Sequence, residues 1–205
     1  MKLLEVNNIS KSFRTRKVLE DVSFTVNSGS IMAVTGENGV GKSTLLNIII
    51  GWLKPDRGTI RINENFGFCP QDPLLFPRLT VNENLDYFRT AYGSKLGKNE
   101  KMQSRPDELL REFDFWSYRD KKVSILSGGT KQKLNLVISL LHDPELMILD
   151  EPYASLDWET YQKFWEYAAY RKKESKSILI VSHFMYDQSM IDELYVIKNH
   201  KLVCA

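Results

Sequence analysis

The sequence predicts an α/β fold with a parallel central sheet, a small antiparallel β-subdomain and an inserted helical subdomain. Three apolar runs without polar interruption are typical of parallel strands that are covered on both faces. These runs span 31–34, 146–149 and 178–181. The stretch 72–141 is more polar and has helical spacing instead. We therefore expect one domain over 1–205, with a core formed by 1–71 and 142–205 and a helical lobe formed by 72–141.

A phosphate-binding loop follows the first apolar run. Residues 36–43 match the pattern G-x-x-x-x-G-K-S, between an expected strand and an expected helix. The glycines let the backbone turn its N–H groups onto phosphate oxygens, and the helix dipole favours the same negative charge. Lys42 can reach the β- and γ-phosphates, and the Ser43 hydroxyl can ligate Mg²⁺. The loop therefore predicts a P-loop NTPase core whose nucleotide-binding residues are Gly36, Glu37, Asn38, Gly39, Val40, Gly41, Lys42, Ser43 and Thr44.

Turn and cap residues set the boundaries of the other elements. Gly51 fits the position just past a helix end, and Thr80 opens a capping box with Glu83. The polar stretch from Gly93 to Pro106 is expected to be a loop before a new helix. In chain order we expect strands at 3–9, 18–26 and 31–34, a helix at 42–50, strands at 59–62 and 66–68, helices at 81–92, at 106–113 and after Gly129, strands at 146–149 and 178–181 joined by a helix at 158–173, and a strand at 194–197.

Composition limits the class of protein. The chain has 205 residues of which 42% are hydrophobic, enough for a full core, and its net charge of +2 mixes both signs, so we expect no nucleic-acid partner. Cys69 and Cys204 form no metal or disulfide pattern, which suits a reducing compartment. The N-terminus lacks the apolar core of a signal peptide, and no apolar stretch approaches the roughly 20 residues of a membrane span. We expect a cytoplasmic protein that can be peripheral on the inner face of the cell membrane through a membrane subunit.

Two carboxylates follow the apolar run 146–149. Asp150 and Glu151 would lie at the carboxyl end of a parallel strand, where such sheets bind ligands. Asp150 suits the hydration shell of Mg²⁺, and Glu151 suits the general base that polarises an attacking water. Alone, the pair would more often be a solvated strand end, but its combination with the phosphate loop favours catalysis.

The motifs together resemble the nucleotide-binding subunit of ATP-binding cassette (ABC) transporters, over about residues 2–203. Each segment of the family stands in its usual order. The segments are Phe13 in the place of the adenine-stacking aromatic, Phe68-Cys69-Pro70-Gln71 as the Q-loop, Leu126-Ser127-Gly128-Gly129-Thr130 as the signature motif, Asp150-Glu151 as the Walker B acids, Ala154-Ser155-Leu156-Asp157 as the D-loop, and Ser182-His183 with the switch histidine.

The resemblance implies ATP and Mg²⁺ as cofactors and a cassette dimer, homodimeric or heterodimeric, that drives a separate transmembrane permease subunit. It implies catalytic roles for Glu151, His183 and Gln71, and metal ligation by Ser43, Gln71 and Asp150. Signature residues would bind the neighbouring cassette's ATP, and they are Ser127, Gly128 and Gly129. The run 77–85 resembles the branch of drug, lipid and ion exporters, so export is the expected direction.

Several residues depart from the family pattern. Thr130 stands where glutamine is usual, which puts one polar contact to the neighbour's nucleotide in doubt. Ala154 opens the D-loop where serine is common, and Tyr153 stands where a small residue is typical. The stretch 58–71 is shorter than in most cassettes, so we expect a trimmed β-subdomain.

Alternatives remain for both site and function. Without the other motifs, Gln71 would be a surface glutamine, Ser127 a helix cap and His183 a strand-end residue, and Phe13 would be a core aromatic. A soluble cassette ATPase of iron–sulfur assembly is the main rival, and a small-molecule kinase would have no use for the signature motif. One apolar cluster beside Gln71 is expected to receive a helix of the membrane subunit, or else to cap the lobe. It consists of Leu74, Leu75, Phe76 and Leu79.

Overall fold

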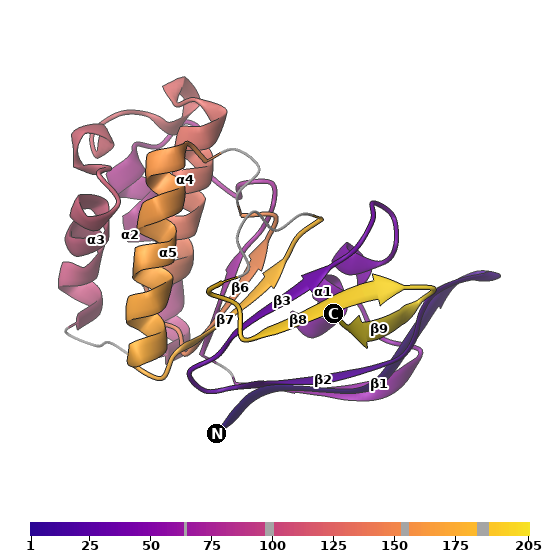
Figure 1. Ribbon diagram of the computed structural model, residues 1–205. Coiled ribbons are helices and arrows are strands. Elements are labelled where there is room, and N and C mark those ends of the chain that lie inside the picture. Colours follow the sequence, from indigo (N-terminus) through magenta and orange to yellow (C-terminus); the bar gives the residue numbers. More distant parts are fainter. Residues whose placement is uncertain (64, 97–100, 153–155, 184–188) are drawn as a thin grey trace.

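The computed structural model describes residues 1–205 except 64, 97–100, 153–155 and 184–188 (Figure 1). A three-stranded antiparallel sheet forms one outer layer. Its order is β2-β1-β4, with β1 (Lys2–Phe13) between β2 (Arg16–Asn27) and β4 (Arg57–Ile62). The expected antiparallel β-subdomain is therefore present.

The second sheet has six strands within the described part of the chain. The order is β5-β6-β7-β3-β8-β9. Its strands are β5 (Phe66–Cys69), β6 (Leu146–Asp150), β7 (Ser177–Val181), β3 (Ile31–Thr35), β8 (Glu193–Lys198) and β9 (Lys201–Cys204). The first five pair in parallel, as expected, and so place their carboxyl ends at one edge of the sheet.

The edge strand β9 was not expected from the sequence, and it pairs antiparallel with β8. Asn199 and His200 form the tight connection, and both have positive φ, at 50° and 69°. Such angles are those of short hairpin turns. Strand β9 was not predicted because four residues are too few to show a clear period.

Helices cover both faces of the six-stranded sheet. The helix α1 (Lys42–Ile49) lies between this sheet and the three-stranded one, whereas α2 to α5 stand on the opposite face (Figure 1). In β3, Met32 and Val34 join the core around α1, and Ile31 and Ala33 join the core of the helical side. This division explains the uninterrupted apolar run, since both faces of the strand are buried.

The helical lobe contains α2 (Val81–Leu96), α3 (Lys101–Glu112) and α4 (Gly128–Leu140), with two short 3₁₀ turns between α3 and α4. The helix α5 (Trp158–Lys173) connects β6 to β7 as expected. The expected loop over 93–106 is wrong for 93–96 and 101–106, which are helical, whereas 97–100 lie outside the described residues. Helix α2 continues through Gly93, and α3 begins before Pro106, which lies inside it. A mid-helix glycine costs only about 1 kcal/mol, so it did not end the helix.

Candidate nucleotide-binding site

The phosphate loop connects β3 to α1, in the strand–turn–helix context that the motif requires. Gly41 precedes the helix with φ of 117°. A Cβ atom there would lie 2.9 Å from Cγ1 of Val18 and 3.2 Å from the Val18 carbonyl oxygen. The strand β2 thus packs so closely against the loop that only glycine fits at this position.

The Lys42 side chain folds back onto the phosphate loop. Its side chain is buried, with 8% exposed. The ammonium group donates to the carbonyl oxygens of Gly36, at 2.7 Å, and Glu37, at 3.1 Å. A buried cation whose partners are neutral carbonyls gains stronger bonds from an anionic ligand. The loop is therefore arranged to accept phosphate.

The two acids lie at the carboxyl end of β6, as expected. Glu151 has φ of 47°, and only 8% of the residue is exposed. Its carboxylate accepts hydrogen bonds from the Ser182 hydroxyl and the His183 backbone N–H, both at 2.7 Å. The same carboxylate lies 2.8 Å from Nδ1 of His183. Three contacts from the end of β7 thus fix the orientation of Glu151.

Asp150 has a strongly perturbed carboxyl group. Burial, and next the charge of Glu151, raise the pKa of Asp150 from 3.8 to about 6, against the opposing effect of Lys42. An acid whose charge is disfavoured by its surroundings gains from a nearby cation. Carboxylate, hydroxyl and amide oxygens are the donors that Mg²⁺ prefers. The residues Asp150, Ser43 and Gln71 line one pocket and so fit a magnesium ion.

This pocket has a volume of about 480 Å³ and joins most of the predicted site residues. Phe13 is on the wall together with the loop, the two acids and His183. Two further residues, Arg16 and Val18, were not predicted from the sequence, because only their position in β2 brings them to the loop. The lining is formed by Phe13, Arg16, Val18, Asn38, Gly39, Gly41, Lys42, Ser43, Thr44, Gln71, Asp150, Glu151 and His183.

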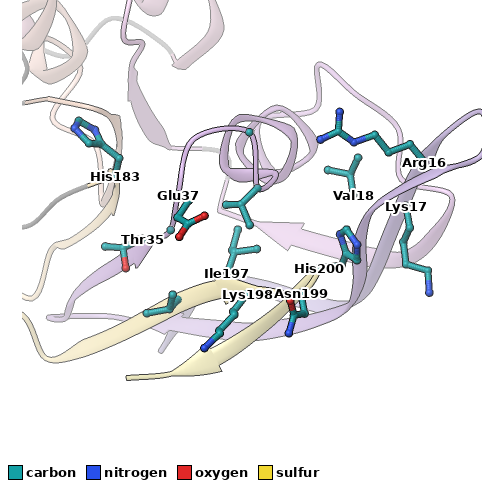
Figure 2. Close-up of a pocket in the computed structure, with 14 residues that line it drawn as sticks. Arg16, Lys17, Val18, Thr35, Glu37, His183, Ile197, Lys198, Asn199 and His200 are labelled. Carbon is teal, nitrogen blue, oxygen red and sulfur yellow. The ribbon is translucent and has the colours of Figure 1, made fainter.

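A larger pocket of about 710 Å³ continues this site toward the β8–β9 turn (Figure 2). The two pockets share Arg16, Val18, Gly39 and His183. Predicted loop residues on its wall are Gly36, Glu37, Gly39 and Val40. Cationic groups outnumber acids here, which favours anions. The larger pocket contains neither Asp150 nor Glu151, and both of these acids line the smaller one.

The predicted signature residues lie apart from this pocket, at the start of α4. Ser127 is the N-cap residue, and its hydroxyl oxygen accepts from the Thr130 backbone N–H at 3.2 Å. The Thr130 hydroxyl lies 2.7 Å from the same oxygen. A Cβ atom at Gly128 would meet nothing within 4 Å. Ser127 and Gly128 therefore form a capped, uncrowded helix N-terminus, and none of Ser127, Gly128 and Gly129 lines the phosphate-loop pocket.

Tyr153 and the first two residues of the D-loop, Ala154 and Ser155, lie outside the described residues. Asp157, at its end, caps α5 by accepting from the Thr160 backbone N–H at 2.8 Å. Among the described residues, no helix is long and apolar enough to cross a membrane.

Fold and site together define a P-loop nucleotide-binding protein. The ABC transporter family matches residues 19–154, and the chain belongs to this family. ABC transporter G family member 20 of Dictyostelium discoideum is 28% identical over 98% of this chain, which spans only 29% of that protein. The lipopolysaccharide export system ATP-binding protein LptB of Haemophilus influenzae is 29% identical, covering 100% of this chain and 90% of that protein. A solved ATP binding subunit of an ABC transporter has a TM-score of 0.91 at 32% identity, over 99% of this chain and 89% of that one.

Membership has direct consequences for function. Cassettes of this family bind ATP and hydrolyse it to power transport, and they work as dimers with transmembrane subunits. Both named relatives are transporter proteins, and neither is an iron–sulfur assembly ATPase.

Proposed function

We propose that this chain is the ATP-hydrolysing motor subunit of an ABC transporter, which couples ATP binding and hydrolysis to export by a separate membrane subunit. One observation carries the proposal. The phosphate-loop lysine, Lys42, shares a single pocket with Asp150, Glu151 and His183. Phosphate-binding and water-activating groups are thus present together, as hydrolysis of a triphosphate requires.

The protein groups divide the chemistry among them. Lys42 and the N–H groups of the loop hold the β- and γ-phosphates, and Phe13 stacks on the base. Glu151, fixed by Ser182 and His183, accepts the proton of the attacking water. Asp150, Ser43 and Gln71 are placed to hold Mg²⁺, which neutralises phosphate charge when bound. His183 donates to the γ-phosphate and responds to its loss.

Two copies of the cassette complete each site. Ser127, Gly128 and Gly129 form a capped helix N-terminus that does not line the chain's own pocket. Such a terminus attracts phosphate, so we assign these residues to the ATP of a neighbouring cassette. ATP binding would close the dimer and hydrolysis would open it.

We assign the docking of a membrane subunit to the surface beside the Q-loop. Leu74 and Phe76 are 56% and 39% exposed, and Phe76 contacts the exposed Tyr87 at a ring distance of 4.5 Å. The sequence predicts that Leu75 belongs to the same surface, but Leu75 packs against the core instead. Asn84, fully buried, fixes the Phe76 backbone through bonds of 2.8 and 3.1 Å. This apolar surface supports docking of a helix from the permease, which would place the chain on the inner face of the membrane.

The test of the proposal is a pair of substitutions in the pocket. Glu151→Gln should bind ATP yet hydrolyse it at least ~100-fold more slowly, because the general base is lost. Lys42→Ala should lose nucleotide binding itself. The measurements are steady-state phosphate release and equilibrium binding of a fluorescent ATP analogue. A Glu151→Gln protein with near-normal turnover would contradict the assignment.

A further inference from the structure

Lys11 contacts Phe13, the aromatic residue that is proposed to stack on the base. Lys11 and Phe13 are two residues apart on β1, so their side chains emerge on the same face of the strand. The Lys11 ammonium nitrogen is 5.6 Å from the centroid of the Phe13 ring. This is within the range of a cation–π contact. Phe13 lines the nucleotide pocket, and Lys11 does not.

The ammonium group is also held by two hydrogen-bond acceptors. It donates to the Lys54 carbonyl oxygen at 2.9 Å and to the Asp56 carboxylate at 2.8 Å. The other oxygen of Asp56 accepts from the Ser12 backbone N–H at 2.7 Å. The side chain of Lys11 is only 14% exposed despite its charge. A lysine with this many fixed contacts is ordered, unlike the usual mobile surface lysine.

Phe13 has few other restraints. It ends β1 next to the turn, 48% of it is exposed, and in the described part of the chain no second aromatic ring packs on it. A fixed neighbour can therefore limit the angle of this ring. The cation also draws ring electron density toward its own face, which leaves the other face better suited to stack on an electron-rich purine.

We infer that Lys11 is a positioning residue for nucleotide binding: clamped by Asp56, it holds the Phe13 ring in the orientation that stacks on the base. The inference rests on the proposed ATP-binding function and adds a specific prediction to it. Lys11 should contribute to recognition of the base, through Phe13, and not to recognition of the phosphates. A lysine that merely joins β1 to the segment before β4 would affect both ligands alike.

The experiment compares two ligands of the phosphate loop by titration calorimetry in the presence of Mg²⁺, namely ATP and tripolyphosphate, which has no base. Lys11→Met keeps the aliphatic stem and removes the charge. It should weaken ATP binding by about threefold to tenfold and leave tripolyphosphate binding unchanged. Lys11→Arg should restore ATP affinity, and KM for ATP should rise in Lys11→Met while kcat stays within about twofold. Lys2→Met is the matched control, because Lys2 is on the same strand in an exposed pair with Glu5.

A double-mutant cycle identifies the route of the effect. In a Phe13→Ala background, Lys11→Met should change ATP affinity by less than about 1.5-fold. Independent effects of the two substitutions, or equal weakening of tripolyphosphate, would overturn the inference. Should Lys11→Met fail to fold, Asp56→Asn tests the same clamp with the same two ligands and the same expected difference. If Phe13→Ala alone leaves ATP affinity unchanged, the base platform is wrong and so is the inference, whereas the ATPase proposal is decided separately by Glu151→Gln.

Discussion

Arg171 forms an ion pair with Asp143 at the place where the helical lobe meets the sheet core. Arg171, on α5, is 2% exposed, and it also donates to the Pro144 carbonyl oxygen at 2.5 Å. Arg105, on α3 of the lobe, reaches the same carboxylate at 2.9 Å, and Lys176, from the segment before β7, reaches it at 2.5 Å. One acid thus joins three cations from three parts of the fold. The carboxylate of Asp143 thus contributes to holding the lobe against the core.

The first prediction concerns the stability of this junction. Asp143→Asn should lower the free energy of unfolding by roughly 2 kcal/mol, because the buried Arg171 would keep only the more distant Glu174, at 3.9 Å, as an anionic partner. The figure is below that of fully buried pairs, since Asp143 is itself partly exposed and solvent screens it. Urea unfolding followed by fluorescence measures the change. The control is Asp86→Asn, which removes an exposed pair with Arg89 and should change stability by less than about 0.5 kcal/mol. Equal effects of the two substitutions would contradict the role of Asp143.

The second prediction concerns how the free energy of unfolding depends on pH. Burial alone would raise the pKa of Asp143, but the hydrogen bonds and charges of Lys176, Arg171 and Arg105 outweigh it and lower this pKa from 3.8 to about 2. Because the pKa of Asp143 is lower in the folded than in the unfolded chain, the carboxylate stabilises the fold at every pH above its pKa in the unfolded chain. This contribution is lost as the pH falls from about 4 toward 2. The difference in unfolding free energy between the native chain and Asp143→Asn should therefore shrink over that window, and a constant difference would contradict it.

Much of the site could be predicted because its residues follow apolar runs. The order of parallel strands brings the ends of β3, β6 and β7 to one edge, and this alone places Lys42, Asp150, Glu151 and His183 together. Roles assigned to individual side chains remain proposals. The parallel sheet followed from the same runs, but the pairing of β4 with β1 could not be predicted, because a short strand gives little information about its partner.

Contacts between distant segments were not accessible from the sequence. Asp56 and Lys11 are 45 residues apart, and nothing in the residues between them indicates that a carboxylate will meet the amine. Asp143 and Arg105 are likewise brought together only by the packing of α3 against the end of α4. The helix boundaries around Pro106 failed for a related reason: tertiary contacts of Arg105 support helix where local propensity predicts a loop.

A third prediction tests how Glu151 is oriented. The Ser182 hydroxyl donates to its carboxylate at 2.7 Å, in addition to the bonds from His183. Ser182→Ala should lower kcat about tenfold with KM for ATP nearly unchanged, because a less well oriented base affects the transition state and not ground-state binding. Ser182→Thr keeps the hydroxyl and should recover most of the rate. A raised KM with unchanged kcat would contradict this role.

A fourth prediction tests the composite site. Ser127→Arg should abolish hydrolysis and leave nucleotide binding by the isolated chain intact, because the serine serves the ATP of the neighbouring cassette. Lys42→Ala instead removes phosphate binding by the chain's own loop. A mixture of the two variants should then recover activity from one complete site, measured as phosphate release against mixing ratio. If no mixture recovers activity, either the head-to-tail arrangement is wrong or both sites must act together, and cross-linking of the mixed dimer separates these outcomes.

The last prediction concerns the surface beside the Q-loop. Phe76 is half-exposed and its backbone is fixed by Asn84, so a new charge on its side chain can reach solvent without breaking the lobe core. Phe76→Asp should leave the basal ATPase rate of the isolated chain within about twofold but abolish co-purification with the permease, since a carboxylate buried at an apolar interface costs several kcal/mol. Val203→Asp is the control, because Val203 is exposed on the edge strand β9, far from the lobe (Figure 1). If Phe76→Asp instead lowers the melting temperature steeply, the aromatic group of Phe76 and Tyr87 belongs to the lobe core, and the docking surface lies elsewhere.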